Sequence, residues 1–248
     1  MIPKIIHFCW FGGNEIPREY KKYIATWKKY CPDYKIVCWT EKKYNIDRCQ
    51  FMKEAYKNKK WGFVPDYARL DIIYRYGGIY LDTDVEILKN IDELLQNKMF
   101  VGLEKGGNHI ALGLGFGAEK GHPFIKELRD KYQDLKFECK DGVVQVPAAP
   151  RIQTPMFRER YRVNFRSDRK YVFDDCVVYP TEYFCPQAYD TGKVSITAKT
   201  LLWHHYSASW FSPKQKCIAE IKKFVSKYCD DELARRFERC LKELWGIK

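Results

Sequence analysis

Two acidic residues separated by one position, Asp82 and Asp84, are the part of this sequence best suited to chemistry. They follow the apolar segment 79–81, which is typical of a buried strand, and alternate residues of a strand share one face. Carboxylates held so close repel each other unless a divalent cation lies between them, and a cation held by two carboxylates keeps coordination positions for phosphate oxygens. An Asp-x-Asp pair is also common in turns, so other segments must decide between the two interpretations.

The segment before the acids adds a second charged pair. Pro65 predicts the start of a helix that Gly77 and Gly78 end, and this helix carries Asp66 and Arg69. Residues three apart on a helix share a face and can form an ion pair, which by spacing alone is equally consistent with a surface salt bridge. Because the helix leads directly into the acidic segment, we expect Arg69 to lie near any phosphate or sugar bound there.

Two distant segments offer further ligand-binding side chains. Trp10 stands at the end of a predicted strand, 4–11, before two glycines, and an aromatic ring there can stack on a flat base, although core packing is the commoner role. His204 and His205 are adjacent, so on a strand at most one of them easily joins a given site, as a third metal ligand. The segment 209–210, Ser-Trp, offers hydrogen-bond donors for a phosphate oxygen.

The predicted elements alternate between strands and helices. Strand 4–11, a helix around 20–27 and strand 34–39 form a β-α-β unit, which favours a parallel pair with a right-handed crossover. Residues 139–175 are expected to be loops with one short helix. The other predicted helices span 49–56, 91–95, 123–132, 215–228 and 231–245, and the other predicted strands span 79–82, 99–103, 112–116, 177–179 and 201–203. In such a sheet the acids lie outside the carboxyl ends of the strands, where α/β proteins bind ligands.

Composition and charge indicate one folded, soluble domain. Aromatic residues make up 16% of the 248 residues, which argues against disorder, and no repeat or linker interrupts the chain. The net charge is +12, with 14 Lys and Arg against 6 acidic residues in 1–60, 10 against 6 in 211–248, and balance between them. No nucleic-acid-binding motif accompanies this charge, so anionic lipid or phosphorylated ligands are the better expected partners.

Cysteines and apolar runs bear on the compartment. The ten cysteines include no CxxC pair, and several occupy apolar patterns (Cys9, Cys38, Cys217 and Cys240), so they are predicted to be reduced core residues. The same spacing disfavours a structural zinc site. The N-terminus lacks a charged leader before a long apolar core, and no apolar run reaches the length of a membrane span, so we expect a cytoplasmic protein.

The order of four motifs resembles a known family. The motifs are Ile-His-Phe-x-Trp-x-Gly-Gly at 6–13, Asp-x-x-Arg at 66–69, Gly-Gly-Ile-Tyr-Leu-Asp-x-Asp at 77–84 and a late His-x-x-x-x-Ser-Trp at 204–210. Together they resemble the sugar-binding DxD glycosyltransferases, which include fungal initiating mannosyltransferases, bacterial capsule glycosyltransferases and, more distantly, the catalytic domains of glucosylating toxins. The resemblance implies an α/β, GT-A type, Rossmann-like fold with a mostly parallel central sheet and C-terminal helices.

The resemblance also implies roles for residues of these motifs. Asp82, Asp84 and Arg69 would be the catalytic residues, and Asp84 with His204 would hold Mn²⁺ or Mg²⁺, His205 being the less favoured ligand. The donor would be bound by His7, Trp10, Asp66, Arg69, Tyr80, Asp82, Ser209 and Trp210. Where the family often has Thr-Gly-Pro this sequence has Gln153-Thr154-Pro155, and the toxins use a different late metal ligand, so the acceptor side and the third ligand stay open.

The sequence therefore predicts a metal-dependent, retaining glycosyltransferase (a hexosyltransferase) that uses a nucleotide-sugar, a UDP-sugar by preference. The acceptor would be a glycan or a polyprenyl-diphosphate-linked precursor of bacterial capsule or surface polysaccharide, at the inner membrane face. Residues 1–103 would bind the donor, 104–210 would form the acceptor side with the late motif, and 211–248 a helical segment. The alternatives are a nucleotide-sugar hydrolase and a non-enzymatic basic protein that binds surfaces or nucleic acid.

Overall fold

A seven-stranded mixed sheet forms the centre of the computed structural model, which describes residues 1–104, 108–140, 143–188, 192–207, 217–218, 221, 224–225 and 231–244. The strand order is β2-β1-β3-β6-β5-β10-β9. These strands are β1 (Ile5–Cys9), β2 (Lys35–Trp39), β3 (Gly78–Tyr80), β5 (Met99–Gly102), β6 (Phe116–Ala118), β9 (Tyr171–Val172) and β10 (Val177–Tyr179). Strands β1, β2, β3, β5 and β10 run in one direction, and β6 and β9 run against them. The predicted α/β fold with a mostly parallel sheet is confirmed.

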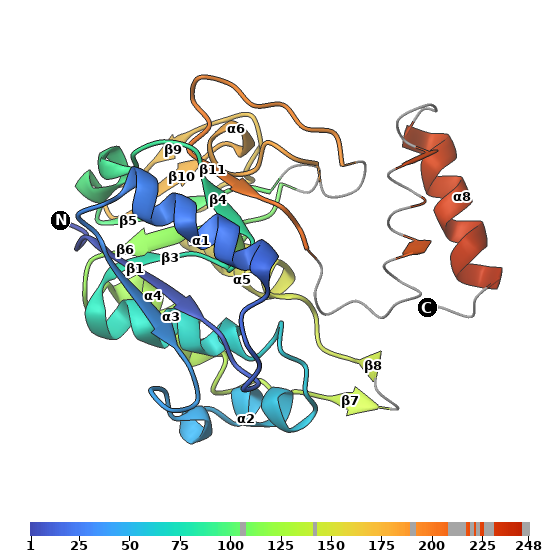
Figure 1. Ribbon diagram of the computed structural model, residues 1–248, viewed down its shortest axis with the longest axis horizontal. Coiled ribbons are helices and arrows are strands. Elements are labelled where there is room, and N and C mark those ends of the chain that lie inside the picture. The colour runs from blue at the N-terminus through green and yellow to red at the C-terminus, as the bar shows by residue number, and fades with distance from the viewer. Residues whose placement is uncertain are drawn as a thin grey trace.

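The other elements are helices and two smaller strand pairs (Figure 1). The helices are α1 (Arg18–Tyr30), α2 (Gln50–Lys57), α3 (Pro65–Tyr76), α4 (Pro123–Lys131), α5 (Ala149–Tyr161), α6 (Thr181–Phe184) and α8 (Asp231–Leu244). Three short 3₁₀ helices, η1 (Ile46–Arg48), η2 (Asp92–Gln96) and η3 (Leu112–Leu114), lie between them. The strand pairs are β4 (Val85–Ile87) with β11 (Leu202–His204) and β7 (Cys139–Lys140) with β8 (Val143–Val144). The predicted parallel pair β1 and β2 is confirmed, with α1 as its crossover.

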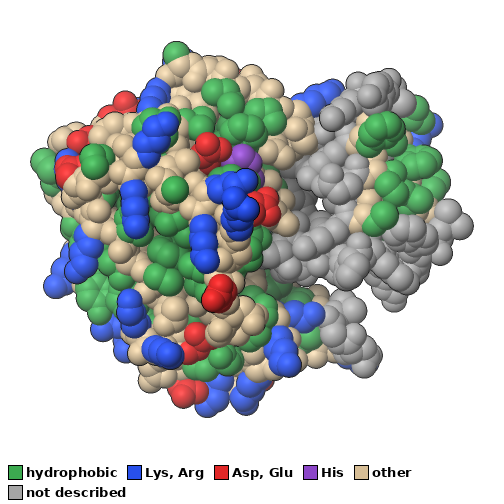
Figure 2. Space-filling view, viewed as in Figure 1, with side chains coloured by type: hydrophobic (Ala, Val, Ile, Leu, Met, Phe, Trp, Pro, Cys, Tyr) green, Lys and Arg blue, Asp and Glu red, His purple; other side chains and the backbone are tan. Residues whose placement is uncertain are grey.

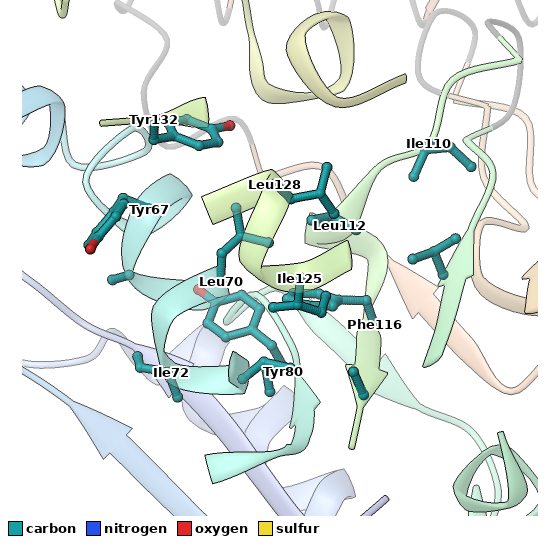
Figure 3. Close-up of a cluster of buried hydrophobic side chains, with 14 of the residues drawn as sticks. Tyr67, Leu70, Ile72, Tyr80, Ile110, Leu112, Phe116, Ile125, Leu128 and Tyr132 are labelled. Atoms are coloured by element: carbon teal, nitrogen blue, oxygen red, sulfur yellow. The ribbon is translucent and has the colours of Figure 1, made fainter. Parts of the chain in front are cut away.

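Alternation along the strands separates two hydrophobic cores, one on each face of the sheet. In β3, Tyr80 faces the core built with α3 and α4, whereas Ile79 faces the core built with α1, β4 and β11. Figure 3 shows the first core, where Leu70 of α3 and Ile125 of α4 pack together with Tyr80 and Phe116 from the sheet. Burial on both faces explains why the strands read as apolar runs.

Helix α3 has the clearest local signals in the chain. Pro65 occupies its first turn, and Gly77 ends it with φ +66°. A Cβ at Gly77 would stand 2.8 Å from the backbone nitrogen of Lys120, so both the conformation and the space require glycine there. The chain therefore turns straight from α3 into β3, as the sequence predicts.

Three predicted elements differ from the structure. Residues 112–116 form the 3₁₀ helix η3 and the start of β6 rather than one strand, because Gly113 and Gly115 interrupt the segment and Gly115 has φ +124°. The loop region 139–175 contains a helix of 13 residues, α5, in addition to the β7–β8 hairpin. Strand β3 ends at Tyr80, so Asp82 and Asp84 lie in the turn between β3 and β4 and not on a strand.

The C-terminal part is described incompletely. Helix α8 matches the predicted helix 231–245, whereas most of the predicted helix 215–228 lies outside the described residues. Cys9 is buried, but Cys217 and Cys240 are exposed and Cys38 is half-buried, so the prediction of core positions is wrong for the two late cysteines. Among the described residues, no helix combines the length and apolar character that a membrane crossing requires. Lys and Arg side chains are spread over the face drawn in Figure 2.

Candidate active site

The pairing of β4 with β11 brings the late histidine segment to the acids. In this antiparallel pair His204 lies opposite Val85, the residue after Asp84. The backbone N–H of His205 donates to the carbonyl oxygen of Asp84 at 3.0 Å, and the backbone N–H of Val85 donates to that of Asp82 at 3.1 Å, which closes the turn. Both acids are therefore held by backbone hydrogen bonds at the carboxyl end of β3.

Asp82, Asp84 and His204 form a candidate metal centre. One ligand atom from each of the three lies within 4.8 Å of the others, and His204 Nε2 lies 3.3 Å from Asp84 Oδ1. Within the described part of the chain, this is the group of three side chains that meets the geometry for an ion. Two carboxylates and one imidazole fit a cation such as Mn²⁺, which accepts oxygen and nitrogen ligands.

The electrostatics of this centre favour an ionised Asp84. Burial alone would raise the pKa of the Asp84 carboxyl, but the nearby His204 and the backbone N–H of Ser207, which donates to Asp84 Oδ2 at 2.9 Å, hold that pKa well below its usual range. In turn, burial opposes the charged form of His204, yet Asp84 raises the pKa of the imidazole above its ordinary value. The two residues thus stabilise each other as an ion pair.

Arg69 links the helix pair to the acidic turn. Nη2 of its guanidinium forms an ion pair with Asp66, and Nη1 lies 3.7 Å from Asp82 Oδ2. The guanidinium carbon Cζ lies 5.5 Å from the centre of the Tyr80 ring. Asp66 is 4% exposed and Arg69 5% exposed, so the alternative of a surface salt bridge is wrong. Burial raises the pKa of Asp66 to about 6, although Arg69 acts to lower it. Arg69 is therefore a fixed positive charge between the buried Asp66 and the half-buried Asp82.

The position of Asp82 depends on a glycine of the opposite wall. A Cβ at Gly113 in η3 would overlap Asp82 Oδ2 and would stand 3.5 Å from Arg69 Nη1. The pKa of Asp82 is raised, first by burial and then by the Asp84 carboxylate, while Arg69 acts in the opposite direction. Gly113 thus leaves the space that lets this carboxylate face Arg69 and the cavity.

All these groups line one cavity of about 1050 Å³. It is large enough for a nucleotide with a sugar attached and has mixed polar and aromatic walls. The predicted site residues on its wall are Trp10, Asp66, Arg69, Tyr80, Asp82, Asp84 and His204. The Trp10 indole donates to the carbonyl oxygen of Asn14 at 2.7 Å and meets Tyr20 edge to face, so its ring is held at the end of β1.

The remaining predicted residues lie elsewhere. His7 is buried in β1, where its Nε2 bonds the carbonyl oxygen of Gly77 at 3.0 Å and its Nδ1 accepts from the Trp39 indole at 3.1 Å, and it does not contribute to the described cavity wall. His205 contacts Glu86 at 2.9 Å and stacks on Tyr23, away from the acids. The predicted donor ligands Ser209 and Trp210 lie outside the described residues.

Several cavity residues escape prediction from the sequence. They are Asn14, Trp61, Glu104, His109, Arg151 and Tyr206. Glu104 is the second residue after β5, so the rule that ligands bind outside the carboxyl ends of strands would have pointed to it. Arg151 and its neighbours lie at the start of α5, in the region that the sequence predicts as loop, and no local pattern marks them.

Comparison with known proteins identifies the sugar-binding part of the chain. Residues 17–101 match the family described as "Glycosyltransferase sugar-binding region containing DXD motif". Inositol phosphoceramide mannosyltransferase 3 of Schizosaccharomyces pombe is 34% identical over 139 residues, which are 51% of this chain and 36% of that protein. Initiation-specific alpha-1,6-mannosyltransferase of Candida albicans is 24% identical over 169 residues, 54% of this chain and 43% of that protein.

One solved glycosyltransferase, GlyE of Streptococcus pneumoniae TIGR4, is similar over 97% of this chain and 64% of its own, with 12% identity and a TM-score of 0.48. The chain spans less than half the length of the two fungal relatives. The family match covers two of the four motifs, those at 66–69 and 77–84, and bears out the resemblance for them; the motifs at 6–13 and 204–210 lie outside the matched residues.

Proposed function

We propose that this chain is a DXD-motif glycosyltransferase. It would move a sugar from a nucleotide-sugar donor to a glycan or lipid-linked acceptor, with retention of anomeric configuration and dependence on a divalent metal. One observation carries the proposal: Asp82, Asp84, His204 and Arg69 meet on the wall of a single cavity large enough for the donor. Residues 1–103 would bind the donor, 104–210 would form the acceptor side, and 211–248 would add helices to the same domain.

The charges of the site match what this reaction requires. The bond between the anomeric carbon and the phosphate oxygen breaks and a bond to the acceptor oxygen forms. The acceptor hydroxyl gives up its proton to the departing phosphate oxygen or to water, and a nucleoside diphosphate leaves with added negative charge. Arg69, fixed between Asp66 and Asp82, would stabilise that charge without reorienting. A cation held by Asp84 and His204, with Asp82 beside it, would neutralise the diphosphate.

Donor binding would use the aromatic end of β1. The Trp10 ring, held by Asn14 and Tyr20, would stack on the base, and Asp66, Tyr80 and Asp82 would surround the sugar and ribose. His7 would support this wall through its hydrogen bond to Gly77, and Ser209 and Trp210 would contact phosphate. We favour a UDP-sugar as donor. The relatives named as mannosyltransferases make mannose the second candidate for the transferred sugar.

The acceptor and the setting are proposals of the same kind. We propose a polysaccharide or polyprenyl-diphosphate-linked precursor in bacterial surface polysaccharide synthesis, made by a cytoplasmic enzyme whose basic ends approach the inner leaflet. The excess of Lys and Arg in 1–60 and 211–248 supports attraction to anionic lipid. Binding to anionic liposomes should weaken as salt rises, and binding that is unchanged across salt concentrations would contradict this part.

Product analysis separates the proposed transferase from its two rivals. Purified protein, Mn²⁺ and each of UDP-glucose, UDP-galactose and GDP-mannose would be incubated with a panel of methyl glycosides, and the products identified by mass spectrometry and NMR. A new glycoside that retains the donor's anomeric configuration supports transfer. Free sugar as the sole product indicates a hydrolase, and no consumption of any donor with no donor binding favours a non-enzymatic protein.

A further inference from the structure

We infer that Glu104 and His109 form the acceptor subsite of this cavity, and that the group they bind is a neutral sugar hydroxyl rather than a phosphate. The inference rests on the proposed function, since it concerns the second substrate of the same reaction. Both residues line the cavity that holds Asp82, Asp84 and Arg69. Both lie outside the four motifs read from the sequence.

Backbone pairing fixes the two residues opposite each other. The backbone N–H of Glu104 donates to the carbonyl oxygen of His109 at 2.9 Å, and Leu103 pairs with Ile110 as an antiparallel bridge. The buried Thr154 hydroxyl of α5 accepts from the backbone N–H of Ile110 at 3.0 Å, which ties Ile110 to that helix. The pair therefore stands near the carboxyl end of β5, which β6 separates from β3 in the sheet.

The chemistry of the pair suits hydroxyl groups. His109 Nδ1 lies 3.3 Å from Glu104 Oε1, and burial, with Arg158 and Arg151 adding to it, lowers the pKa of the imidazole. A neutral His109 that donates Nδ1–H to Glu104 leaves its Nε2 and the second carboxylate oxygen as hydrogen-bond acceptors. Two neighbouring acceptors match two hydroxyl hydrogens of a sugar ring. The Glu104 side chain is 24% exposed, so a ligand can reach it.

The carboxylate of Glu104 disfavours a phosphate in direct contact with it, although Arg151 and Arg158 supply positive charge on the His109 side. Glu104 adds a carboxylate to a cavity that already holds Asp66, Asp82 and Asp84. The donor diphosphate would occupy Arg69 and the metal, so an acceptor phosphate beside Glu104 would face like charges. Arg151, on the same wall, can donate to the oxygen atoms of a neutral sugar. A lipid-linked acceptor would then be one that already carries a sugar.

The test compares transfer with donor hydrolysis in the same assay. Glu104→Gln should lower transfer to methyl glycosides about tenfold or more, mainly through a higher acceptor KM, because a site built for hydroxyls discriminates strongly once a partner is lost. His109→Gln should act in the same direction. Hydrolysis of the nucleotide sugar by water and the donor KM should change much less than transfer, since neither residue contacts the donor in this assignment, although the Glu104 carboxyl acts electrostatically on His204. Glu127→Gln, an exposed acid that pairs with Arg160, is the matched control.

Each outcome decides the point. Equal loss of hydrolysis and transfer in Glu104→Gln would place the residue in the donor site or in the fold, and would overturn the inference. Transfer to farnesyl phosphate that exceeds transfer to every methyl glycoside would also overturn the inference. So would a wild type in which every methyl glycoside leaves donor hydrolysis unchanged and receives no sugar. In all three cases the wild type still consumes donor, so the proposed function stands. Failure of the wild type to bind or consume any donor would instead reject the proposed function.

Discussion

His204 Nε2 lies 3.3 Å from Asp84 Oδ1, which joins the end of the late strand β11 to the turn that follows β3. The contact exists because β11 pairs with β4, the strand that begins directly after Asp84. Burial makes this pair dependent on mutual neutralisation, and a divalent cation between Asp82, Asp84 and His204 would provide the same neutralisation with positions left for a diphosphate.

Asp84→Asn should abolish metal-dependent turnover while the protein stays folded. The substitution keeps the shape of the side chain but removes its charge, so we expect turnover to fall about 100-fold or more. The apparent affinity for Mn²⁺ should fall as well, and it can be measured by the metal dependence of donor consumption. Asp168→Asn, which changes an exposed acid paired with Arg166, is the control. Near wild-type turnover in Asp84→Asn would remove this residue from the site.

Arg69→Lys should reduce turnover about 10-fold to 100-fold, because a lysine cannot face Asp66 and Asp82 together as the planar guanidinium does. Arg75→Lys on the same helix is the matched control, since Arg75 pairs with Asp71 instead of the cavity acids. Steady-state kinetics on both variants measure the difference. Equal effects of the two changes would indicate that Arg69 acts through the stability of α3 alone.

Gly113→Ala should lower activity more than stability. The added methyl group would displace Asp82 from its place beside Arg69, and a displacement of about 1 Å at a reacting site costs up to about 100-fold in rate. Gly121→Ala is the contrasting variant, because Gly121 has φ +76° but an added Cβ there would meet no neighbouring atom. That variant should lose about 1 kcal/mol of stability through backbone strain and keep its activity. Thermal unfolding and kinetics on both proteins check the contrast.

Because of His7, the free energy of unfolding of the ligand-free protein should decrease as pH is lowered from 6.5 to about 4. Burial lowers the pKa of His7 to about 4, and the hydrogen bonds to Gly77 and from Trp39 fit the neutral ring. Within this window the unfolded chain binds a proton that the folded protein does not, so the stabilisation is complete above the ordinary pKa of 6.5 and is lost as pH falls. The full effect is at most about 3 kcal/mol, from about 1.4 kcal/mol per pKa unit.

Urea unfolding of wild type and His7→Gln across this range tests the prediction. Asp66, whose pKa is raised to about 6, acts in the opposite direction in the lower part of the window, so the difference between the two proteins isolates His7. The variant should be less stable at pH 7 and should show the flatter dependence. Parallel curves for the two proteins would contradict the assignment of a neutral, buried His7.

Local signals account for the parts of the fold that the sequence predicts well. The proline at the start of α3, the glycine at its end and the apolar runs of β1, β2 and β5 act within a few residues of themselves. The pair Asp66 and Arg69 could be predicted as a pair from helical spacing, but its burial depends on packing against the sheet. The convergence of Asp82 and Asp84 was expected from a strand, whereas a turn produces it.

Long-range pairing accounts for what could not be predicted. Two contacts depend on the register of β11 against β4, which no local pattern encodes. They are the contacts of His204 with Asp84 and of His205 with Glu86. Glu104 and His109 meet through backbone pairing that no local pattern marks, and α5 interrupts a segment rich in proline and charge. These are the segments that build the side of the cavity opposite the recognisable motifs.

Calorimetric titration of UDP and GDP into the protein, with and without Mn²⁺, tests the central claim most directly. Wild type should bind one of the two nucleotides with Mn²⁺ present, and binding should weaken at least about tenfold when the metal is chelated or when Asp84 is changed to asparagine. Tight nucleotide binding whose affinity changes neither on removal of Mn²⁺ nor in Asp84→Asn would contradict a metal-assisted diphosphate site at Asp82, Asp84 and His204.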